Sequence, residues 1–159
     1  MGRFNKTKKR TLNPDPLYNS RLVMQLVNKT MKSGKKSIAF KHVYQALEET
    51  GKKLKKEPLE ILRLALENVK PNMEVRPRRV GGAAYQVPMP VKGDRRLSLA
   101  LRWLIQAANA RPNKEYHTFS EKLTAELLDA YQNTGGAVKK KQDVHRMSEA
   151  NKAFAHFRW

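Results

Sequence analysis

Residues 73–91 read MEVRPRRVGGAAYQVPMPV and lack the apolar period of a helix. Pro77, Pro88 and Pro90 would each destabilise a helix interior by roughly 3 kcal/mol. Gly81-Gly82 lies between two extended runs, and both glycines can adopt the positive φ of a tight turn. The segment is therefore predicted to form a two-stranded β-hairpin.

This hairpin is expected to be a ribbon without neighbours, because proline is excluded from the central strands of a sheet. An isolated ribbon is marginally stable in water and would gain order by lying on a partner. Arg76, Arg78 and Arg79 supply cations for such a contact. Arginine suits phosphate because its planar group binds bidentately and also stacks on bases.

Three amphipathic helices are predicted before the hairpin. The first runs from Tyr18 to about Ser33-Gly34, and the second begins near Lys35. Pro58 suits the first position of the third helix, and Pro71 ends it. Their apolar stripes are Leu22, Val23, Leu26 and Val27, then Ala39, Val43, Ala46 and Leu47, then Leu59, Leu62, Leu66 and Val69.

Three more helices are predicted after the hairpin. Asp94 can cap the fourth, and Thr118 with Glu121 forms a capping box for the fifth, which Gly135-Gly136 ends. The sixth covers about residues 138–154. The inward residues are expected to be Leu97, Leu101, Leu104 and Ala108, then Phe119, Leu123 and Leu127, then Val144, Met147, Ala150 and Phe154.

The predicted fold class is all-α, a bundle of about six helices with one β-hairpin arm projecting between the third and fourth. Residues 1–16 are expected to be a flexible basic arm, since residues 1–11 have almost nothing apolar to bury. Residues 17–159 form a single helical domain that includes the hairpin 73–91 and a C-terminal helix and tail, 137–159.

The net charge points to a polyanionic partner. The 159 residues include 33 Lys and Arg against 14 Asp and Glu, a net charge of +19, and self-repulsion at such a charge opposes folding. Residues 1–11, 12–69, 70–111 and 137–159 carry +5, +5, +7 and +4, whereas 112–136 carry −2. The charge-poor segment is a candidate for a face turned to another protein or to solvent.

Composition excludes several classes of protein. The absence of cysteine rules out a disulfide framework, cysteine-based zinc sites and thiol catalysis. The longest apolar clusters are interrupted by Arg102 and are too short for a membrane span. The first residues lack the apolar stretch of a secretory signal and make a poor transit peptide. We expect a soluble, intracellular protein that binds neither a membrane nor a small-molecule substrate.

Gly34-Lys35-Lys36-Ser37 resembles part of a phosphate-binding loop. That motif requires Gly at position 29 and Ser or Thr at position 36, and both positions hold lysine. What remains is a lysine-rich helix start, for which we favour a nucleic-acid phosphate contact over a merely solvated end.

No catalytic or metal site is predicted, and no cofactor. The four histidines, His42, His117, His145 and His156, share no i, i+4 pair. His145 and His156 are expected to hydrogen-bond to RNA or to neighbouring helices. No Ser/His/Asp or paired-carboxylate arrangement can be singled out.

The aromatic residues allow more than one interpretation. Trp103 falls on the apolar side of the fourth helix and is expected in the core. Tyr85 could stack on a base or pack internally, and both remain open. Phe157 and Trp159, in the tail, favour an interface with RNA or protein.

Two other classes of protein share some of these features. An architectural DNA-binding protein is also basic and helical with a ribbon arm. An RNA-cleaving enzyme would need a carboxylate cluster for a metal ion, yet Glu74, Asp94, Asp143 and Glu149 are scattered between helices and hairpin.

Residues 78–88, RRVGGAAYQVP, are similar to the signature of the universal family of the seventh small-subunit ribosomal protein, in its bacterial type. Further matches are Pro14-Asp15-Pro16, the Gly34 motif, Arg102-Trp103-Leu104 and the tail HRMSEANKAFAHFRW, residues 145–159. The resemblance is collinear over essentially the whole chain.

The resemblance implies a primary rRNA-binding protein that nucleates the 3′ major domain, or head, of the small subunit. It implies a hairpin at the subunit interface near exit-site tRNA and mRNA, and contacts with the eleventh small-subunit protein and other head proteins. Many bacterial members repress translation of their own operon. A cytoplasmic ribosome is expected, an organellar one remains open, and no enzymatic activity is expected.

The resemblance also implies which residues bind RNA. Those nearest tRNA and mRNA are Arg78, Arg79 and Tyr85. The rRNA-binding residues are Arg3, Lys6, Lys8, Lys9, Arg10, Lys35, Lys36, Arg76, Arg78, Arg79, Arg95, Arg96, Arg102, Lys139, Lys140, Lys141 and Arg146.

Overall fold

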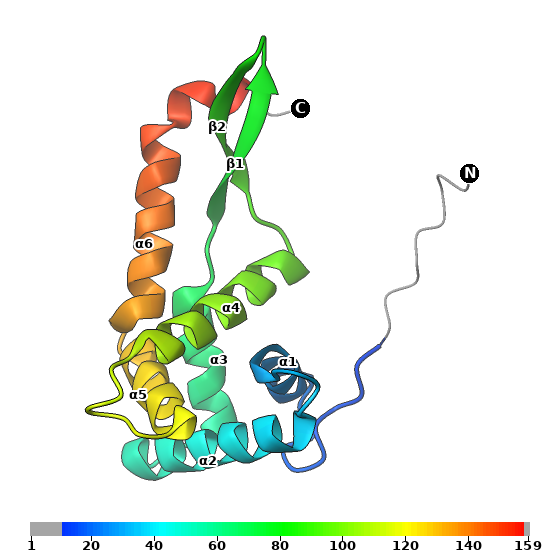
Figure 1. Ribbon diagram of the computed structural model, residues 1–159, viewed down its shortest axis with the longest axis vertical. Helices are drawn as coiled ribbons and strands as arrows, with labels where there is room; N and C mark the ends of the chain where they lie inside the picture. The colour runs from blue at the N-terminus through cyan, green and yellow to red at the C-terminus, as the bar shows by residue number, and fades with distance from the viewer. Residues whose placement is uncertain (1–10, 158–159) are drawn as a thin grey trace.

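The computed structural model describes residues 11–157, and over this range the chain is a set of helices from which one hairpin projects (Figure 1). This confirms the predicted fold class. The elements in chain order are α1 (Arg21–Thr30), α2 (Lys36–Leu54), α3 (Pro58–Val69), β1 (Met73–Val80), β2 (Ala83–Pro90), α4 (Asp94–Ala110), α5 (Phe119–Tyr131), α6 (Gly135–Ala150) and the 3-10 helix η1 (Lys152–Phe157).

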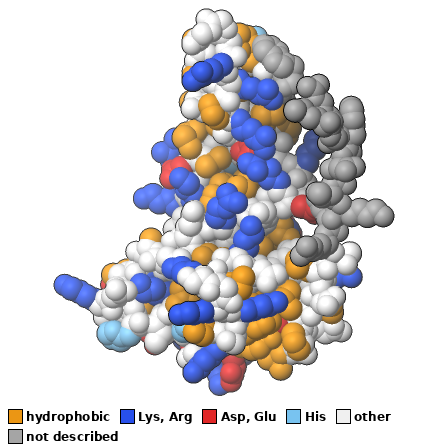
Figure 2. Space-filling view, turned by 45° about the vertical axis from the view of Figure 1, so that its right-hand side comes forward, with side chains coloured by type: hydrophobic (Ala, Val, Ile, Leu, Met, Phe, Trp, Pro, Cys, Tyr) orange, Lys and Arg blue, Asp and Glu red, His pale blue; other side chains and the backbone are white. Residues whose placement is uncertain are grey.

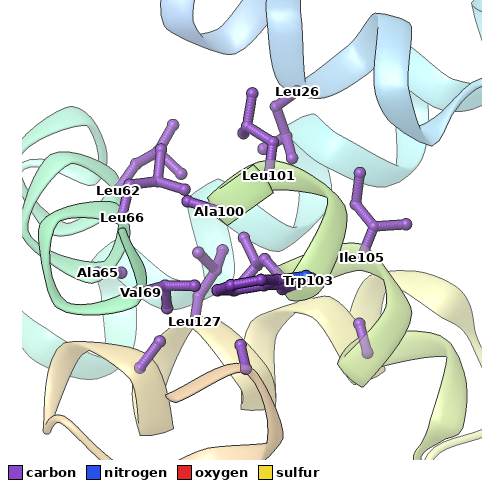
Figure 3. Close-up of a cluster of buried hydrophobic side chains, with 14 of the residues drawn as sticks. Leu26, Leu62, Ala65, Leu66, Val69, Ala100, Leu101, Trp103, Ile105 and Leu127 are labelled. Carbon is purple, nitrogen blue, oxygen red and sulfur yellow. The ribbon is translucent and has the colours of Figure 1, made fainter. Parts of the chain in front are cut away.

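The hydrophobic core forms around α4, which packs against α1, α3, α5 and α6 (Figure 3). Leu99, Ala100 and Leu101 are all buried, so α4 presents apolar surface in several directions. Each fully buried large aliphatic side chain contributes about 1.5–3 kcal/mol. Trp103 is 8% exposed, which confirms it as a core residue. Within residues 11–157 no helix combines the length and apolar character needed to cross a bilayer.

The segment before α1 makes that helix shorter than predicted. The Asp15 carboxylate accepts hydrogen bonds from the backbone N–H groups of Leu17 (3.2 Å) and Tyr18 (3.0 Å), which forms a turn where the helix was expected to begin. The Tyr44 hydroxyl also donates to Asp15 at 2.6 Å. Asp15 is 1% exposed and so anchors the chain entry against α2. Burial, followed by this hydrogen bond, raises the pKa of Tyr44.

The hairpin has the predicted turn. β1 and β2 pair antiparallel, with Val80 opposite Ala83 at the closed end. Gly81 and Gly82 connect them with φ of +57° and +88°, the region that a two-residue type I′ turn requires. Within the described chain the sheet has these two strands alone, so each proline lies on a strand with an open edge.

The expectation of a ribbon without neighbours is wrong in one respect, because the C-terminal segment packs along it. α6 contacts both strands, and η1 contacts β2. The Tyr85 ring lies 5.1 Å from the ring of Phe154 and 5.2 Å from that of Phe157, centroid to centroid. The partner that orders the hairpin is therefore, at least in part, the chain itself, and Tyr85 and Phe157 contribute to internal packing.

The junction between α5 and α6 corrects a second prediction. Gly135-Gly136 does not end α5, which finishes at Tyr131; instead Gly135 begins α6. The turn between them is made by Asn133, with φ of +60°, and by a hydrogen bond from Thr134 N–H to the Asp129 carbonyl at 2.8 Å. The Thr118–Glu121 capping box at the start of α5 is present as predicted.

Two further details differ from the prediction. Gly93, rather than Asp94, occupies the N-cap position of α4, and glycine has no side chain with which to cap the helix. In α6, Met147 is 47% exposed and Ala150 is exposed too. The buried face of α6 is instead Ala137, Val138, Val144 and Ser148. Because Ser148 is one of these buried residues, the apolar period predicts the wrong face of α6 near the end of the helix.

Candidate nucleic-acid interface

Cationic side chains gather on one face from the hairpin end of the molecule to its middle (Figure 2). The predicted RNA-binding residues that are exposed are Lys35, Lys36, Arg76, Arg79, Arg95, Arg102, Lys139, Lys140 and Arg146, while Arg78, Arg96 and Lys141 are partly buried. The other predicted residues, Arg3, Lys6, Lys8, Lys9 and Arg10, lie outside the described residues, as does Trp159.

The fold brings Arg76 and Arg95 together on Glu74. Arg76 Nε donates to Glu74 Oε1 at 2.6 Å, and Arg95 NH2 donates to Oε2 at 2.6 Å. The Glu74 side chain is 10% exposed, whereas those of Arg76 and Arg95 are 45% and 49% exposed. A buried carboxylate thus holds two solvent-facing arginines, one from β1 and one from the first turn of α4.

Two other predicted RNA-binding residues hold the base of the hairpin. Arg96 donates from Nε to the Pro71 carbonyl at 3.1 Å and from NH2 to Asn72 Oδ1 at 2.7 Å. Lys141 Nζ donates to the Asn68 carbonyl at 2.7 Å, where α3 ends. These cations have a structural task, which accounts for their partial burial.

Lys35 and Lys36 lie at the exposed start of α2, away from the hairpin. Lys35 is the N-cap residue, and no side chain accepts a hydrogen bond from the first turn. A helix start without a side-chain cap leaves backbone N–H groups for water or an anion. The Lys36 ammonium also lies 5.6 Å from the centre of the Phe40 ring. This geometry is compatible with the predicted phosphate contact.

His145 joins α6 to the entrance of the hairpin. Its Nε2 accepts a hydrogen bond from the backbone N–H of Asn72 at 3.0 Å. This contact requires the ring to be neutral at Nε2. Burial lowers the pKa of His145, Lys141 lowers it further, and Glu149 acts in the opposite sense with a smaller effect. The structure thus pairs His145 with the segment between α3 and β1, whereas a neighbouring helix or RNA was predicted.

We expect His145 to make the protein less stable in mild acid. Its ordinary pKa is 6.5, and its folded-state pKa lies below this value. The unfolded chain therefore binds the proton first, so stability is complete above pH 6.5 and falls as the pH drops through the folded-state pKa. Urea unfolding at a series of pH values would measure this.

The matched variant is His145→Gln, whose side-chain oxygen can accept the same N–H but does not titrate. Its stability should change less with pH in this window than that of the wild type. Equal pH dependence of the two proteins would contradict the assignment.

Glu74 is the residue of this surface that sequence reasoning left aside. In the sequence it is one of four acids scattered between the helices and the hairpin. One signal was available, because residues two apart in a strand share a face, which places Glu74 beside Arg76. Arg95 could not be added from the sequence, since it is 21 residues away and reaches Glu74 only because α4 begins beside the hairpin base.

Comparisons with known proteins agree over nearly the whole chain. The family model described as Ribosomal protein S7p/S5e matches residues 2–152. Small ribosomal subunit protein uS7 of Caldicellulosiruptor saccharolyticus is 58% identical over 159 residues, which is 100% of both chains. The uS7 protein of Symbiobacterium thermophilum is 54% identical over the same span, again 100% of both. That of Thermosipho melanesiensis is 58% identical over 150 residues, 94% of this chain and 95% of the relative.

The molecule combines a helical body, a basic hairpin and a face of exposed cations. These features are typical of a protein that serves as a nucleic-acid-binding scaffold. Together with the full-length matches, these features give a more specific answer. The chain belongs to the ribosomal protein S7p/S5e family, whose curated relatives here are uS7 proteins of the small subunit. It is accordingly a structural protein of the ribosome, which is a ribonucleoprotein, and its role in translation is to bind rRNA. The resemblance stated from the sequence is confirmed.

Proposed function

We propose that this protein is a primary rRNA-binding protein that nucleates assembly of the 3′ major domain, the head of the small subunit. The observation that carries the proposal is the set of exposed cations on the hairpin and the start of α4, of which Arg76 and Arg95 are central. The buried α4 core beneath them provides a rigid base. The residues that the sequence predicts to contact rRNA are part of this proposal.

The physical reason for such a protein lies in RNA folding. Compact rRNA brings phosphates close together, and bound cations must offset their repulsion. Lys and Arg on a rigid scaffold do this without the further cost of ordering the backbone on binding. Duplex RNA has a deep, narrow major groove, so recognition depends mainly on shape, backbone and 2′-hydroxyl groups. The protein works by holding RNA, without bond chemistry.

The hairpin is assigned to the subunit interface, near exit-site tRNA and the path of mRNA. Arg79 is exposed near the turn and Arg78 is partly buried beside it. Tyr85, also assigned to this region, stands opposite Arg78 in the hairpin, and its ring packs on Phe154. We therefore assign tRNA contact first to the arginines, with Tyr85 supporting the strand that presents them.

Further parts of the proposal concern partners and location. We propose contacts with the eleventh small-subunit protein and other head proteins, and repression of the protein's own operon messenger. The ribosome concerned is assigned to the cytoplasm. The family to which the chain belongs supports these assignments.

A chemical footprint on small-subunit rRNA tests the main proposal. Purified protein should protect a compact set of nucleotides within the 3′ major domain. A parallel competition with duplex DNA of equal phosphate content distinguishes an architectural DNA-binding protein. Protection spread evenly over the whole rRNA, or equal competition by DNA, would contradict the proposed function.

We expect Arg78→Ala with Arg79→Ala to impair exit-site function more than initial rRNA binding. Removing two cations near the turn leaves the clustered cations at the hairpin base and α4 in place. Binding to the rRNA fragment should weaken by no more than about tenfold, because a contact at the edge of an interface contributes little. Filter binding and tRNA occupancy of reconstituted subunits would measure the two effects.

The matched control is Lys52→Ala with Lys53→Ala, which removes equal charge at the far end of α2 (Figure 1). It should leave exit-site tRNA occupancy unchanged. If the arginine variant remains folded yet fails to bind rRNA at all, the hairpin is an anchor and this division of roles is wrong.

A further inference from the structure

The contacts of Glu74 use its two oxygens fully but leave much of each arginine available. Oε1 accepts from Arg76 Nε at 2.6 Å and from Arg95 Nε at 2.9 Å, and Oε2 accepts from Arg95 Nε at 2.8 Å and NH2 at 2.6 Å. Because Oε1 accepts a hydrogen bond from each Nε atom, the two guanidinium groups lie next to each other. The NH1 groups and Arg76 NH2 are not used by Glu74.

We propose that Glu74, Arg76 and Arg95 form a preformed clamp for a single RNA backbone phosphate, with Glu74 as the positioning residue. This inference rests on the proposed function and deepens it, because it assigns one ligand group to one site. The arginines contact the phosphate, and Glu74 acts through them.

Charge and geometry both favour a phosphate. Two guanidinium groups and one carboxylate leave one net positive charge, and the carboxylate is largely buried while the arginines are about half exposed. Arginine binds phosphate oxygens in a bidentate manner, and such charge-assisted bonds are about twice as strong as neutral ones. Arg95 also lies in the first turn of α4, where the helix dipole favours an anion.

Preorganisation is what Glu74 adds. A free arginine side chain must lose rotamer freedom when it binds, at about 0.5–1.5 kcal/mol for each immobilised side chain. Here the hydrogen bonds to a buried carboxylate have already restricted both side chains. Burial by itself would raise the pKa of Glu74, but hydrogen bonds from Arg95 and Arg76 outweigh it and leave the pKa below its ordinary value. Glu74 is therefore ionised at neutral pH.

The sign of one substitution distinguishes positioning from simple charge. Glu74→Gln removes a negative charge from a surface that binds a polyanion, so electrostatics alone predicts tighter RNA binding. The clamp predicts weaker binding, by about tenfold, because the two arginines lose their fixed orientation. It also predicts that the slope of log affinity against log salt becomes shallower by about one.

Glu48→Gln is the matched control. Glu48 is 63% exposed and pairs with Lys52 on α2, so this change also removes one acid beside one cation. Its effect on affinity should be slight and in the direction of tighter binding. Both variants are titrated with the same rRNA fragment over a range of salt concentrations, and thermal unfolding is recorded for each.

A second pair of variants keeps the charge and changes only the geometry. Arg95→Lys retains a cation but cannot contact Glu74 in the same forked manner, so affinity should fall by about fivefold to tenfold. Arg63→Lys, at an exposed position on α3 that is not among the predicted rRNA-binding residues, should change it by less than about twofold. This pair remains informative if Glu74→Gln weakens the fold.

The outcomes are distinct. Weaker binding by Glu74→Gln and Arg95→Lys, with the controls near wild type, supports the clamp. Unchanged or tighter binding by both, while the wild type binds normally, overturns the clamp and leaves the proposed function intact. A wild-type protein that does not bind the rRNA fragment would instead refute the proposed function.

Discussion

Raising the salt concentration from roughly 50 to 200 mM should weaken binding of the rRNA fragment by about 10³–10⁵, the range for six to ten neutralised phosphates on duplex DNA. The predicted contact set includes nine exposed cations among the described residues, which is within this range. Each contact releases condensed counterions from the RNA, and added salt opposes that release. This is the largest effect that we expect for the protein.

Equilibrium titration of the purified protein at several salt concentrations measures the slope of log affinity against log salt. The free protein should keep its helical circular-dichroism signal over the same range, which separates dissociation from unfolding. A nearly flat response would show that apolar or neutral contacts dominate, and the role of the cationic face would then be refuted.

Replacing Glu126 by Ala should lower the free energy of unfolding by about 3–5 kcal/mol, the usual cost of leaving one partner of a buried ion pair alone. The Glu126 side chain is 2% exposed, and that of its partner Arg111 is 17% exposed. Arg111 donates to Glu126 Oε2 from Nε at 2.9 Å and from NH2 at 2.7 Å. Without the carboxylate, a largely buried guanidinium keeps only one acidic partner.

Glu126 also connects three helices, which adds to the effect. Its second oxygen, Oε1, accepts the backbone N–H of Ala137 in the first turn of α6 at 2.8 Å. Arg111 follows the end of α4, and Glu126 belongs to α5. Burial by itself would lower the pKa of Arg111, but the hydrogen bonds that it donates to Asp129 and Glu126 raise it. The substitution should therefore loosen the start of α6 as well as the end of α4.

The matched control is Asp129→Ala, because Asp129 also pairs with Arg111 but its side chain is 41% exposed. That change should cost about 1 kcal/mol or less, as for exposed ion pairs. Urea unfolding of both variants, followed by tryptophan fluorescence, measures the difference; Trp103 in the core reports on it. Equal effects of the two substitutions would contradict the special role of the buried carboxylate.

Much of the fold could be predicted because its signals are local. The apolar stripes of the first five helices, the capping box at Thr118 and the Gly81-Gly82 turn each depend on residues a few positions apart. The errors arose where the structure depends on contacts and turns that these local patterns do not specify. Asp15 shortens α1 by accepting the backbone N–H groups of Leu17 and Tyr18 and is held against α2 by Tyr44. The α5–α6 turn uses Asn133 as well as Gly135, and that glycine starts α6 instead of ending α5.

The sequence predicts the kind of site, a cationic surface, but it does not predict how the residues of that surface are arranged. Counting charge identified the hairpin and the start of α4 as cationic. It did not distinguish Arg96 and Lys141, which bond to backbone carbonyls, from Arg79, which is exposed. Burial and hydrogen-bond partners separate these roles, and both depend on packing.

The sequence by itself determined the class of fold, the turn of the hairpin and the polyanionic nature of the ligand, because periodicity, glycine conformation and net charge act over short range or in sum. Only the tertiary structure decided that α6 and η1 support the hairpin, and that Glu74 joins Arg76 to Arg95. The contact between His145 and Asn72 spans 73 positions in the chain. Pairings of this kind follow from how helices pack together, and no local pattern in the sequence encodes them.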